Sequence, residues 1–204
     1  MVDVKREATC AHAVDGPEHL VAEILDGELV LSPHPAPGHA SVASYLGAEL
    51  IPQFCRRRDA SGSRGWVILH EPELHLGQQV VIPDLAGWRR ERLPVLPDAA
   101  YLTLPPDWVC EIASKSTEKL DRRRKLPLYA AVGVGHAWLV HPRLRTIEVL
   151  CNLDGKWLNL AVYGDDEQIR AAPFEAHALE LATLWADLPS RASEPAAEYG
   201  NAAR

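Results

Sequence analysis

Two apolar stretches of the chain each contain one acid: residues 80–88, Val-Val-Ile-Pro-Asp-Leu-Ala-Gly-Trp, and residues 108–113, Trp-Val-Cys-Glu-Ile-Ala. Their composition predicts two buried β-strands. The second run is apolar on both faces, which predicts a central place in a sheet. A buried ionised carboxylate is costly unless it is paired or binds a metal. Asp84 and Glu111 are therefore the first candidates for functional residues.

The two acids suggest a magnesium site. Carboxylates on neighbouring strands repel each other, and a divalent cation between them removes the repulsion. Mg²⁺ takes one or two carboxylates, keeps several waters and completes its shell with substrate phosphate. The competing interpretation is structural: Asp84 caps a turn, and Glu111 pairs with an arginine of the helix that follows it. Pro83 removes one ladder hydrogen bond, which favours an edge or the splayed end of a strand.

The rest of the chain predicts an α/β (α+β) domain with a central mixed sheet flanked by helices and additional hairpins. Asp26-Gly27 is a hairpin signal, and Thr117 is a candidate N-cap for a helix that Pro127 kinks or splits. Gly133 would end that helix. We expect helices over 17–26, 38–54, 117–131 and 180–188, and strands over 28–32, 66–69, 80–88, 107–113, 137–141, 146–151 and 156–163.

Length and composition favour one ordinary globular domain. The chain has 204 residues, of which 47% are hydrophobic and 24% charged. We find no membrane-spanning run and no apolar signal core near the N-terminus. Four widely spaced cysteines, with no CxxC pair, favour a reduced cytoplasmic protein over a zinc knuckle. Residues 1–14 are expected to be a flexible N-terminus, 15–188 the domain, and 189–204 a disordered tail.

Charge is unevenly distributed along the chain. The net charge is −7, yet residues 37–147 carry +4 while 1–36 carry −5 and 148–204 carry −6. The overall acidity argues against a general nucleic-acid coat protein. The basic clusters at 56–58, 89–92 and 122–125 fall in the stretch that holds both acids, which gives modest support for a polyanionic substrate.

The ordered motifs resemble a known family. Pro83-Asp84, then Glu111 and a helix rich in Lys and Arg, resemble the PD-(D/E)XK nuclease superfamily with its restriction-endonuclease-like fold. The finer resemblance is to the Uma-two family of candidate bacterial endonucleases. The resembling segments span about 15–188: Glu23 to Leu29, Ser32-Pro33 with His39, Pro83 to Leu85, Val109 to Ser114, Asp121 to Lys125, Leu128-Tyr129, Gly133-Val134, Ala137 to Pro142, and Leu179 to Trp185.

The resemblance implies roles for individual residues. Asp84 and Glu111 would hold Mg²⁺ or Mn²⁺, and Glu23, on the first helix, would hold a metal-bound water. The superfamily's lysine normally stands two residues after the Glu, where this chain has Ala113. Lys125 matches the family's helical lysine and would orient the attacking water and stabilise charge in the transition state.

Other residues leave alternatives open. Lys115, only four positions after Glu111, is a rival to Lys125, and Lys119 is a weaker one. His39 is the best histidine candidate, although a local hydrogen bond would explain it equally well. Asp121 is interpreted as setting the helix start or pairing with an arginine. The remaining histidine pairs are interpreted as structural: His70 with His75, and His136 with His141.

The resulting hypothesis is a metal-dependent endonuclease that cuts DNA, acting as a homodimer because two sites suit two strands. Two alternatives stay open. One is a catalytically inactive nuclease-fold module for binding or dimerisation, motivated by the missing Glu-x-Lys pattern and the overall acidity. The other is a nuclease that acts on RNA or on small phosphodiesters.

Overall fold

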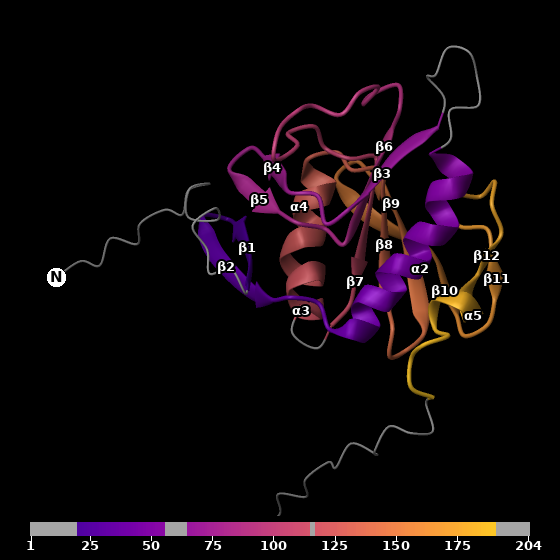
Figure 1. Cartoon of the computed structure of the whole chain (residues 1–204). Coiled ribbons are helices and arrows are strands. Elements are labelled where there is room, and N and C mark those ends of the chain that lie inside the picture. Colours follow the sequence, from indigo (N-terminus) through magenta and orange to yellow (C-terminus); the bar gives the residue numbers. More distant parts are fainter. Residues whose placement is uncertain (1–19, 56–64, 115–116, 191–204) are drawn as a thin grey trace, which may run out of the picture.

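The computed structural model describes residues 20–55, 65–114 and 117–190. A six-stranded mixed sheet, in the order β10-β9-β8-β7-β6-β3, forms the centre, and a four-stranded sheet, β2-β1-β5-β4, stands beside it (Figure 1). The strands are β1 (Leu20–Leu25), β2 (Glu28–Pro33), β3 (Trp66–His70), β4 (Leu74–Leu76), β5 (Gln79–Val81), β6 (Leu85–Arg89), β7 (Trp108–Ile112), β8 (His136–His141), β9 (Thr146–Leu153), β10 (Lys156–Gly164), β11 (Gln168–Ile169) and β12 (Leu179–Glu180).

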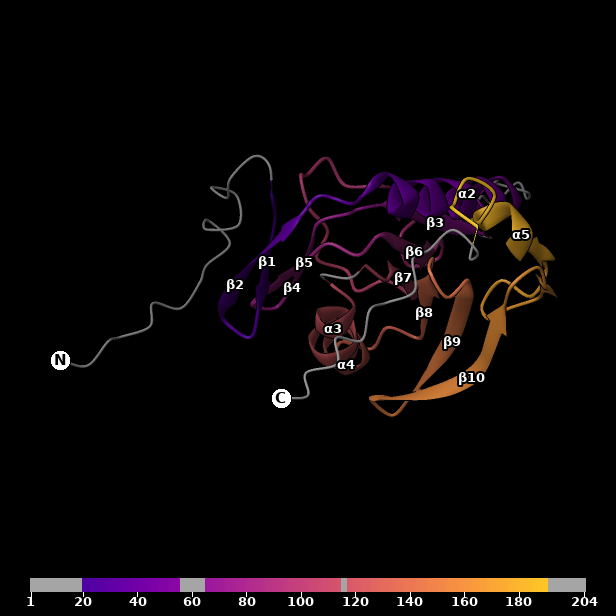
Figure 2. The ribbon, with the colours of Figure 1, turned by 90° about the horizontal axis from the view of Figure 1, so that it is seen from below.

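Helices cover both faces of the six-stranded sheet, as the sequence predicted. Helix α2 (Pro37–Phe54) lies on one face with the short α5 (Leu181–Leu184), and α3 (Glu118–Leu120), the π-helical η1 (Asp121–Lys125) and α4 (Leu126–Ala131) lie on the other (Figure 2). Val42, Leu46 and Leu50 of α2 join the first core cluster. Leu126 and Tyr129 of α4 join the second, which contains Val109 of β7. Strand β7 therefore separates two cores.

The first predicted helix, 17–26, is wrong over its described part, because Leu20–Leu25 is strand β1. Asp26 and Gly27 both adopt positive φ, 51° and 75°, as a two-residue hairpin turn of this kind requires. The turn pairs Leu25 with Glu28, and β1 also pairs with β5 through Ile24 and Val80. Sheet pairing outweighs the helical spacing of the apolar residues, and Glu23 therefore lies on a strand.

The single strand predicted over 80–88 is also wrong. The chain leaves β5 at Val81 and enters β6 at Leu85, so the two halves belong to different sheets. Pro83 stands in the break, where its missing N–H costs no ladder bond. Asp84 thereby sits at the splayed start of β6.

The helix predicted over 117–131 is present but not uniform. Its middle turn widens, and the N–H of Leu126 bonds to the carbonyl of Asp121, five residues back. Pro127 follows at once and cannot donate a helical bond, so the distortion comes just before it. Thr117 makes no side-chain cap; its N–H instead donates to Ser114 Oγ at 3.1 Å. Gly133 ends the helical segment with φ 86°, as predicted.

The C-terminal part is largely as predicted. Strands β8, β9 and β10 are the expected hairpins, but α5 covers only Leu181–Leu184 of the helix expected over 180–188. Glu180 instead pairs with Gln168 in the β11–β12 ladder. Of the expected N-terminal segment and tail, only Pro189 and Ser190 fall within the described residues.

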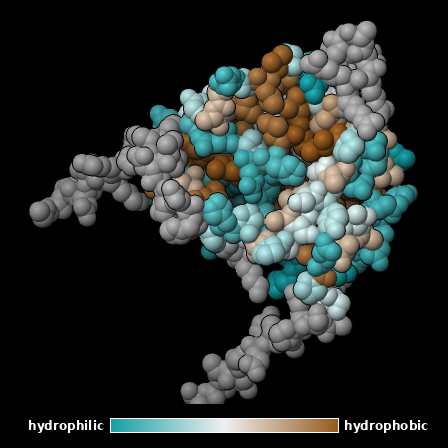
Figure 3. Space-filling model, viewed as in Figure 1, coloured by the Kyte–Doolittle hydropathy of each residue, from teal (hydrophilic) through white to brown (hydrophobic). Residues whose placement is uncertain are grey.

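The long loop between β6 and β7 carries exposed apolar side chains, including Val95, Leu96 and Tyr101. Figure 3 shows an apolar patch at the top of this face, where Figure 1 draws that loop. Among the described residues, no helix is long and apolar enough to cross a membrane.

Candidate active site

Glu111 lies in the middle of the site, buried on central strand β7 with 3% of its surface exposed. Its neighbours Cys110 and Ile112 point into the first core cluster, and because side chains alternate along a strand, Glu111 faces the helix on the other side. Its Oε1 accepts a hydrogen bond from Tyr129 Oη at 2.6 Å and lies 2.9 Å from Lys125 Nζ. Glu111 thus pairs with a lysine and a tyrosine, and the alternative of an arginine partner is wrong.

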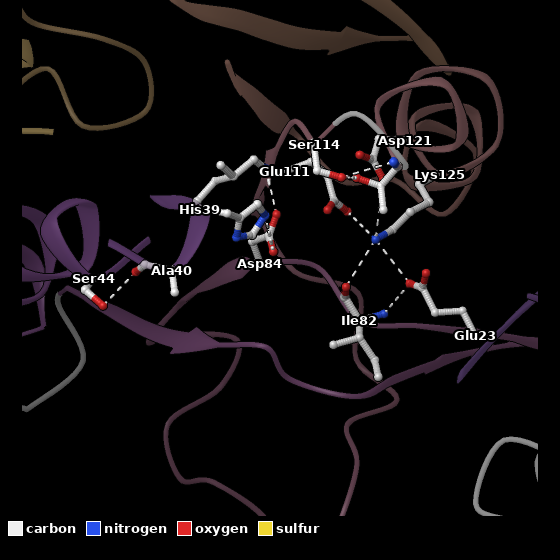
Figure 4. Close-up of polar contacts among 12 residues, drawn as sticks. Glu23, His39, Ala40, Ser44, Ile82, Asp84, Glu111, Ser114, Asp121 and Lys125 are labelled. Atoms are coloured by element: carbon white, nitrogen blue, oxygen red, sulfur yellow. Dashed lines mark hydrogen bonds and ion pairs between the residues drawn. The ribbon is translucent and has the colours of Figure 1, made fainter. Parts of the chain in front are cut away.

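Lys125 is the basic partner that the structure places at the acids. Its Nζ lies 2.9 Å from Glu111 Oε1 and 3.1 Å from Glu23 Oε1, and donates to the carbonyl of Ile82 at 3.1 Å (Figure 4). An ammonium has three N–H donors, and these three acceptors engage all of them. Burial lowers the pKa of Lys125, but the surrounding carboxylates outweigh burial and raise it above its ordinary value. Lys125 therefore stays charged at any physiological pH.

Glu23 reaches the site from β1 in the smaller sheet. Its Oε1 also accepts the backbone N–H of Ile82 at 2.8 Å, in the break between β5 and β6. Only 4% of its surface is exposed. Lys125 thereby links Glu23 of the smaller sheet to Glu111 of the six-stranded sheet through two buried ion pairs.

Asp84 stands beside Glu111 because of the register between β6 and β7. Leu85 pairs with Cys110 in antiparallel strands, which brings the preceding acid level with Glu111. Asp84 Oδ2 accepts the N–H of Ile112 at 2.6 Å, and Oδ1 lies 3.2 Å from His39 Nε2. Figure 4 shows Asp84 and Glu111 as neighbours, with Lys125 on the far side of Glu111.

His39, in the first turn of α2, joins the site through Asp84. Burial lowers the pKa of His39, but its hydrogen bond to Asp84, the charge of Asp84, the backbone of Ile112 and the charge of Glu71 together raise it. A raised pKa favours the imidazolium near neutral pH. The contact that His39 makes is therefore not the local hydrogen bond of the structural alternative, but one to Asp84, a candidate metal ligand on another element.

Asp121 also belongs to this site, although the sequence analysis gave it only a local role. It is buried on η1, and its Oδ1 lies 3.9 Å from Lys125 Nζ. Burial is the main cause that raises its pKa to about 6, with Asp84 and Glu23 adding to it and Lys125 opposing. Its spacing of four from Lys125 on a helix was the available signal.

Negative charge exceeds positive charge in this buried site. Four carboxylates surround one ammonium: Glu23, Asp84, Glu111 and Asp121 around Lys125. Burial raises the pKa of Glu111 well above its usual range, and the charges of Asp121 and Asp84 raise it further. Lys125 and the Tyr129 hydrogen bond oppose this shift. The site would gain stability from additional positive charge.

The donor set fits a hard divalent cation. Tyr129 and Lys125 both contact Oε1 of Glu111, so neither contact involves Oε2. Among the described residues, no three His, Cys, Asp or Glu side chains form a preassembled metal cluster. The carboxylate oxygens of Asp84 and Glu111 are hard ligands of the kind that Mg²⁺ takes.

Tyr129 is a second residue whose role was missed, although Leu128-Tyr129 belongs to the resembling segments. A tyrosine in an apolar helical run is predicted to be a core residue, and Tyr129 is indeed fully buried. Only the contact across to β7 shows its polar function. Burial raises the pKa of Tyr129 well above its usual range, and the charges of Glu111 and Glu23 raise it further. The Tyr129 hydroxyl therefore remains a donor.

Most of the described basic clusters are engaged within the molecule. Arg122 bonds to Glu148, Arg124 to Glu28, and Arg92 to Asp107. Arg90 donates to the carbonyl of Trp66, and Arg89 lies over the Trp66 ring. Because these arginines have partners within the molecule, they give less support for a binding surface for a polyanion than their number in the sequence suggested. Residues 56–58 and the rival Lys115 lie outside the described residues.

A hollow of about 520 Å³ opens next to the acids. Its lining includes His39, which contacts Asp84, and Ala113, two residues after Glu111. Ala113 stands where the resembling superfamily has its lysine, and Glu111 itself is 3% exposed. The hollow thus borders residues that contact or follow the acids, while Asp84 and Glu111 themselves do not line it.

Comparison with protein families identifies the chain. The family model Uma2, described as "Putative restriction endonuclease", matches residues 12–183. The chain belongs to the Uma2 family. This family membership supports a nuclease function and confirms the resemblance to the Uma-two family.

A solved structure has the same fold as this Uma2 protein. It is the crystal structure of a "putative nuclease belonging to DUF820" from Anabaena variabilis, with a TM-score of 0.66 and 20% sequence identity. The match covers 88% of this chain and 98% of the other. No curated protein matches the chain.

Proposed function

We propose that this Uma2 protein is a metal-dependent endonuclease that hydrolyses phosphodiester bonds in DNA. The observation that carries the proposal is the meeting of Asp84 and Glu111 at adjacent strands, next to an open hollow, in a site with excess buried negative charge. A phosphodiester is an anion and would be repelled by these acids unless a cation were bound between them. Family membership supports the same reaction class.

Asp84 and Glu111 would hold Mg²⁺ or Mn²⁺, with Glu23 as an outer acid. A bound divalent cation would polarise a phosphoryl oxygen and lower the pKa of a bound water. The chain's own contribution is positioning: the Ile112 N–H orients Asp84, while Tyr129 and Lys125 orient Glu111.

Lys125 would act as a fixed charge rather than as a general base. Its raised pKa keeps it protonated, and its three N–H groups are engaged by Glu111, Glu23 and Ile82. It would therefore hold the carboxylates in place and contribute positive potential near the phosphoryl group. His39, also with a raised pKa, would add positive charge on the substrate side of Asp84.

The test compares Asp84→Ala with Asp166→Ala, an exposed acid outside the site, as the matched control. We expect wild type and the control to bind Mn²⁺ in calorimetry and to nick supercoiled plasmid with Mg²⁺ or Mn²⁺. Asp84→Ala should lose both properties. A purified wild-type protein that binds no Mn²⁺ and cuts neither DNA nor RNA would contradict the proposal and favour the inactive module.

RNA cleavage without DNA cleavage would keep the metal site but overturn the DNA assignment. Homodimerisation stays a prediction from two-strand cleavage, and sedimentation with and without DNA tests it.

A further inference from the structure

The hollow beside the acids has a basic rim that the metal site does not use. It lies between the first turn of α2 and the turn that joins β8 to β9, where the chain reads His141-Pro-Arg-Leu-Arg145. Arg143 is exposed on this turn and has no hydrogen-bond or ion-pair partner among the described residues. It thus differs from Arg122, Arg124 and Arg92, whose charges are paired.

Arg145 and His141 line the hollow on the same side as Arg143. Arg145 donates to the carbonyl of Pro189 at 3.3 Å and thereby fixes the C-terminal segment at the hollow. His141 accepts the N–H of Leu144 at Nδ1, which places the imidazole proton on Nε2. That Nε2 lies 3.6 Å from Glu118 Oε2, and both residues line the hollow. Glu118 is also paired with Arg122, which reduces the repulsion it would exert on an anion.

The opposite wall offers backbone donors and an apolar surface. The first amides of a helix have no intrahelical acceptor, and α2 has no side-chain cap and no acid in its first turn. Gly38 in that turn lies so close to Leu188 that an added Cβ would stand 3.1 Å from its Cδ2. Leu188 and Pro189 give the hollow an apolar side. One wall therefore suits a phosphate and the other suits a sugar or base.

We propose that this hollow is a nucleotide subsite for the DNA strand that is cut, with Arg143 holding the phosphate next to the scissile one. The inference rests on the proposed function, because it takes the acids beside His39 and Ala113 as the place of cleavage. The volume, about 520 Å³, falls within the range of small-molecule pockets. His141 Nε2 would supply a second donor to the same phosphate.

The experiment measures binding separately from cleavage. A fluorescein-labelled oligothymidylate is titrated with full-length protein in Ca²⁺, and anisotropy gives Kd over a series of salt concentrations. The variants are Arg143→Gln, Arg143→Lys and Arg123→Gln, the last removing an exposed arginine of η1 away from the hollow. Arg143→Gln should raise Kd about tenfold, as loss of a charged hydrogen bond does. It should also reduce the salt slope by about 0.7, the value of one single-strand phosphate contact.

The control variants distinguish binding at this subsite from a general effect of positive charge on DNA affinity. Arg143→Lys should recover most of the affinity and the whole salt slope, and Arg123→Gln should match wild type. Equal effects of Arg143→Gln and Arg123→Gln on Kd and slope would overturn the subsite. Tighter, equally Arg143-dependent binding of oligouridylate would overturn its assignment to DNA. If wild type binds through Arg143 but neither binds Mn²⁺ nor cuts DNA, the subsite stands and the proposed catalysis fails.

Discussion

The candidate site has two halves that differ in burial. Glu111, Glu23, Asp121 and Lys125 are 3–4% exposed and belong to the packed interior. Asp84 and His39 have side chains that are 15% and 10% exposed, and His39 lines the hollow. Buried charges interact strongly and depend on one another for stability, whereas partly solvated ones do so less. We therefore expect mutations in the buried half to change stability and mutations of Asp84 to change function alone.

The largest effect should come from Lys125→Met. It leaves buried carboxylates without their cation, and we expect a loss of about 3–5 kcal/mol in the free energy of unfolding. The loss should be smaller at pH 4 than at pH 8, because protonation neutralises the acids. Urea denaturation measures it, with Lys119→Met, an exposed lysine of α3, as control. A loss no larger than the control's would show that the buried half tolerates its charges.

Asp121→Asn should stabilise the protein, by about 1–3 kcal/mol at pH 8. The folded-state pKa of Asp121 is raised from 3.8 to about 6, so the folded protein binds this proton more tightly than the unfolded chain does. Its contribution to stability is therefore fully present below pH 3.8 and falls as the pH rises through 6. The gain should vanish at pH 3.5, and thermal denaturation across pH tests this. Uniform destabilisation at every pH would contradict the prediction.

Tyr129→Phe should cost about 1–2 kcal/mol, because it removes a buried donor from Glu111 Oε1. The matched control is Tyr45→Phe, whose hydroxyl bonds to Asp187 in an exposed pair. We expect the control to cost less. Mn²⁺ affinity should also fall in Tyr129→Phe alone, since Glu111 loses one of its two orienting contacts.

The smallest change in stability should belong to Asp84→Asn, at under about 1 kcal/mol. The amide oxygen can still accept the Ile112 N–H, so the local structure remains. Mn²⁺ binding and nicking should nevertheless be lost. A large loss of stability would remove the contrast between the two halves and assign Asp84 a structural role.

The comparison also explains which residues could be found in the sequence. Asp84 and Glu111 stand out because a charge inside an apolar run requires a reason, whereas Lys125 follows a run of arginines and was found through the family resemblance. Glu23 was found only through the family resemblance, and its predicted helix was wrong. Asp121 and Tyr129 gave weaker signals, because an acid next to arginines and a tyrosine in a helix have ordinary explanations.

The sequence by itself determined the alternation that buries Glu111 on one face of β7, the hairpin at Asp26-Gly27 and the helix end at Gly133. These depend on local backbone geometry and side-chain periodicity, which neighbours in the chain specify. Only the tertiary structure decided that β1 pairs with β5, that the chain changes sheets at Pro83, and that Lys125 satisfies three acceptors. Long-range pairing decides these features, because it determines which carboxylates share one buried space and which arginines of the described residues are paired with acids.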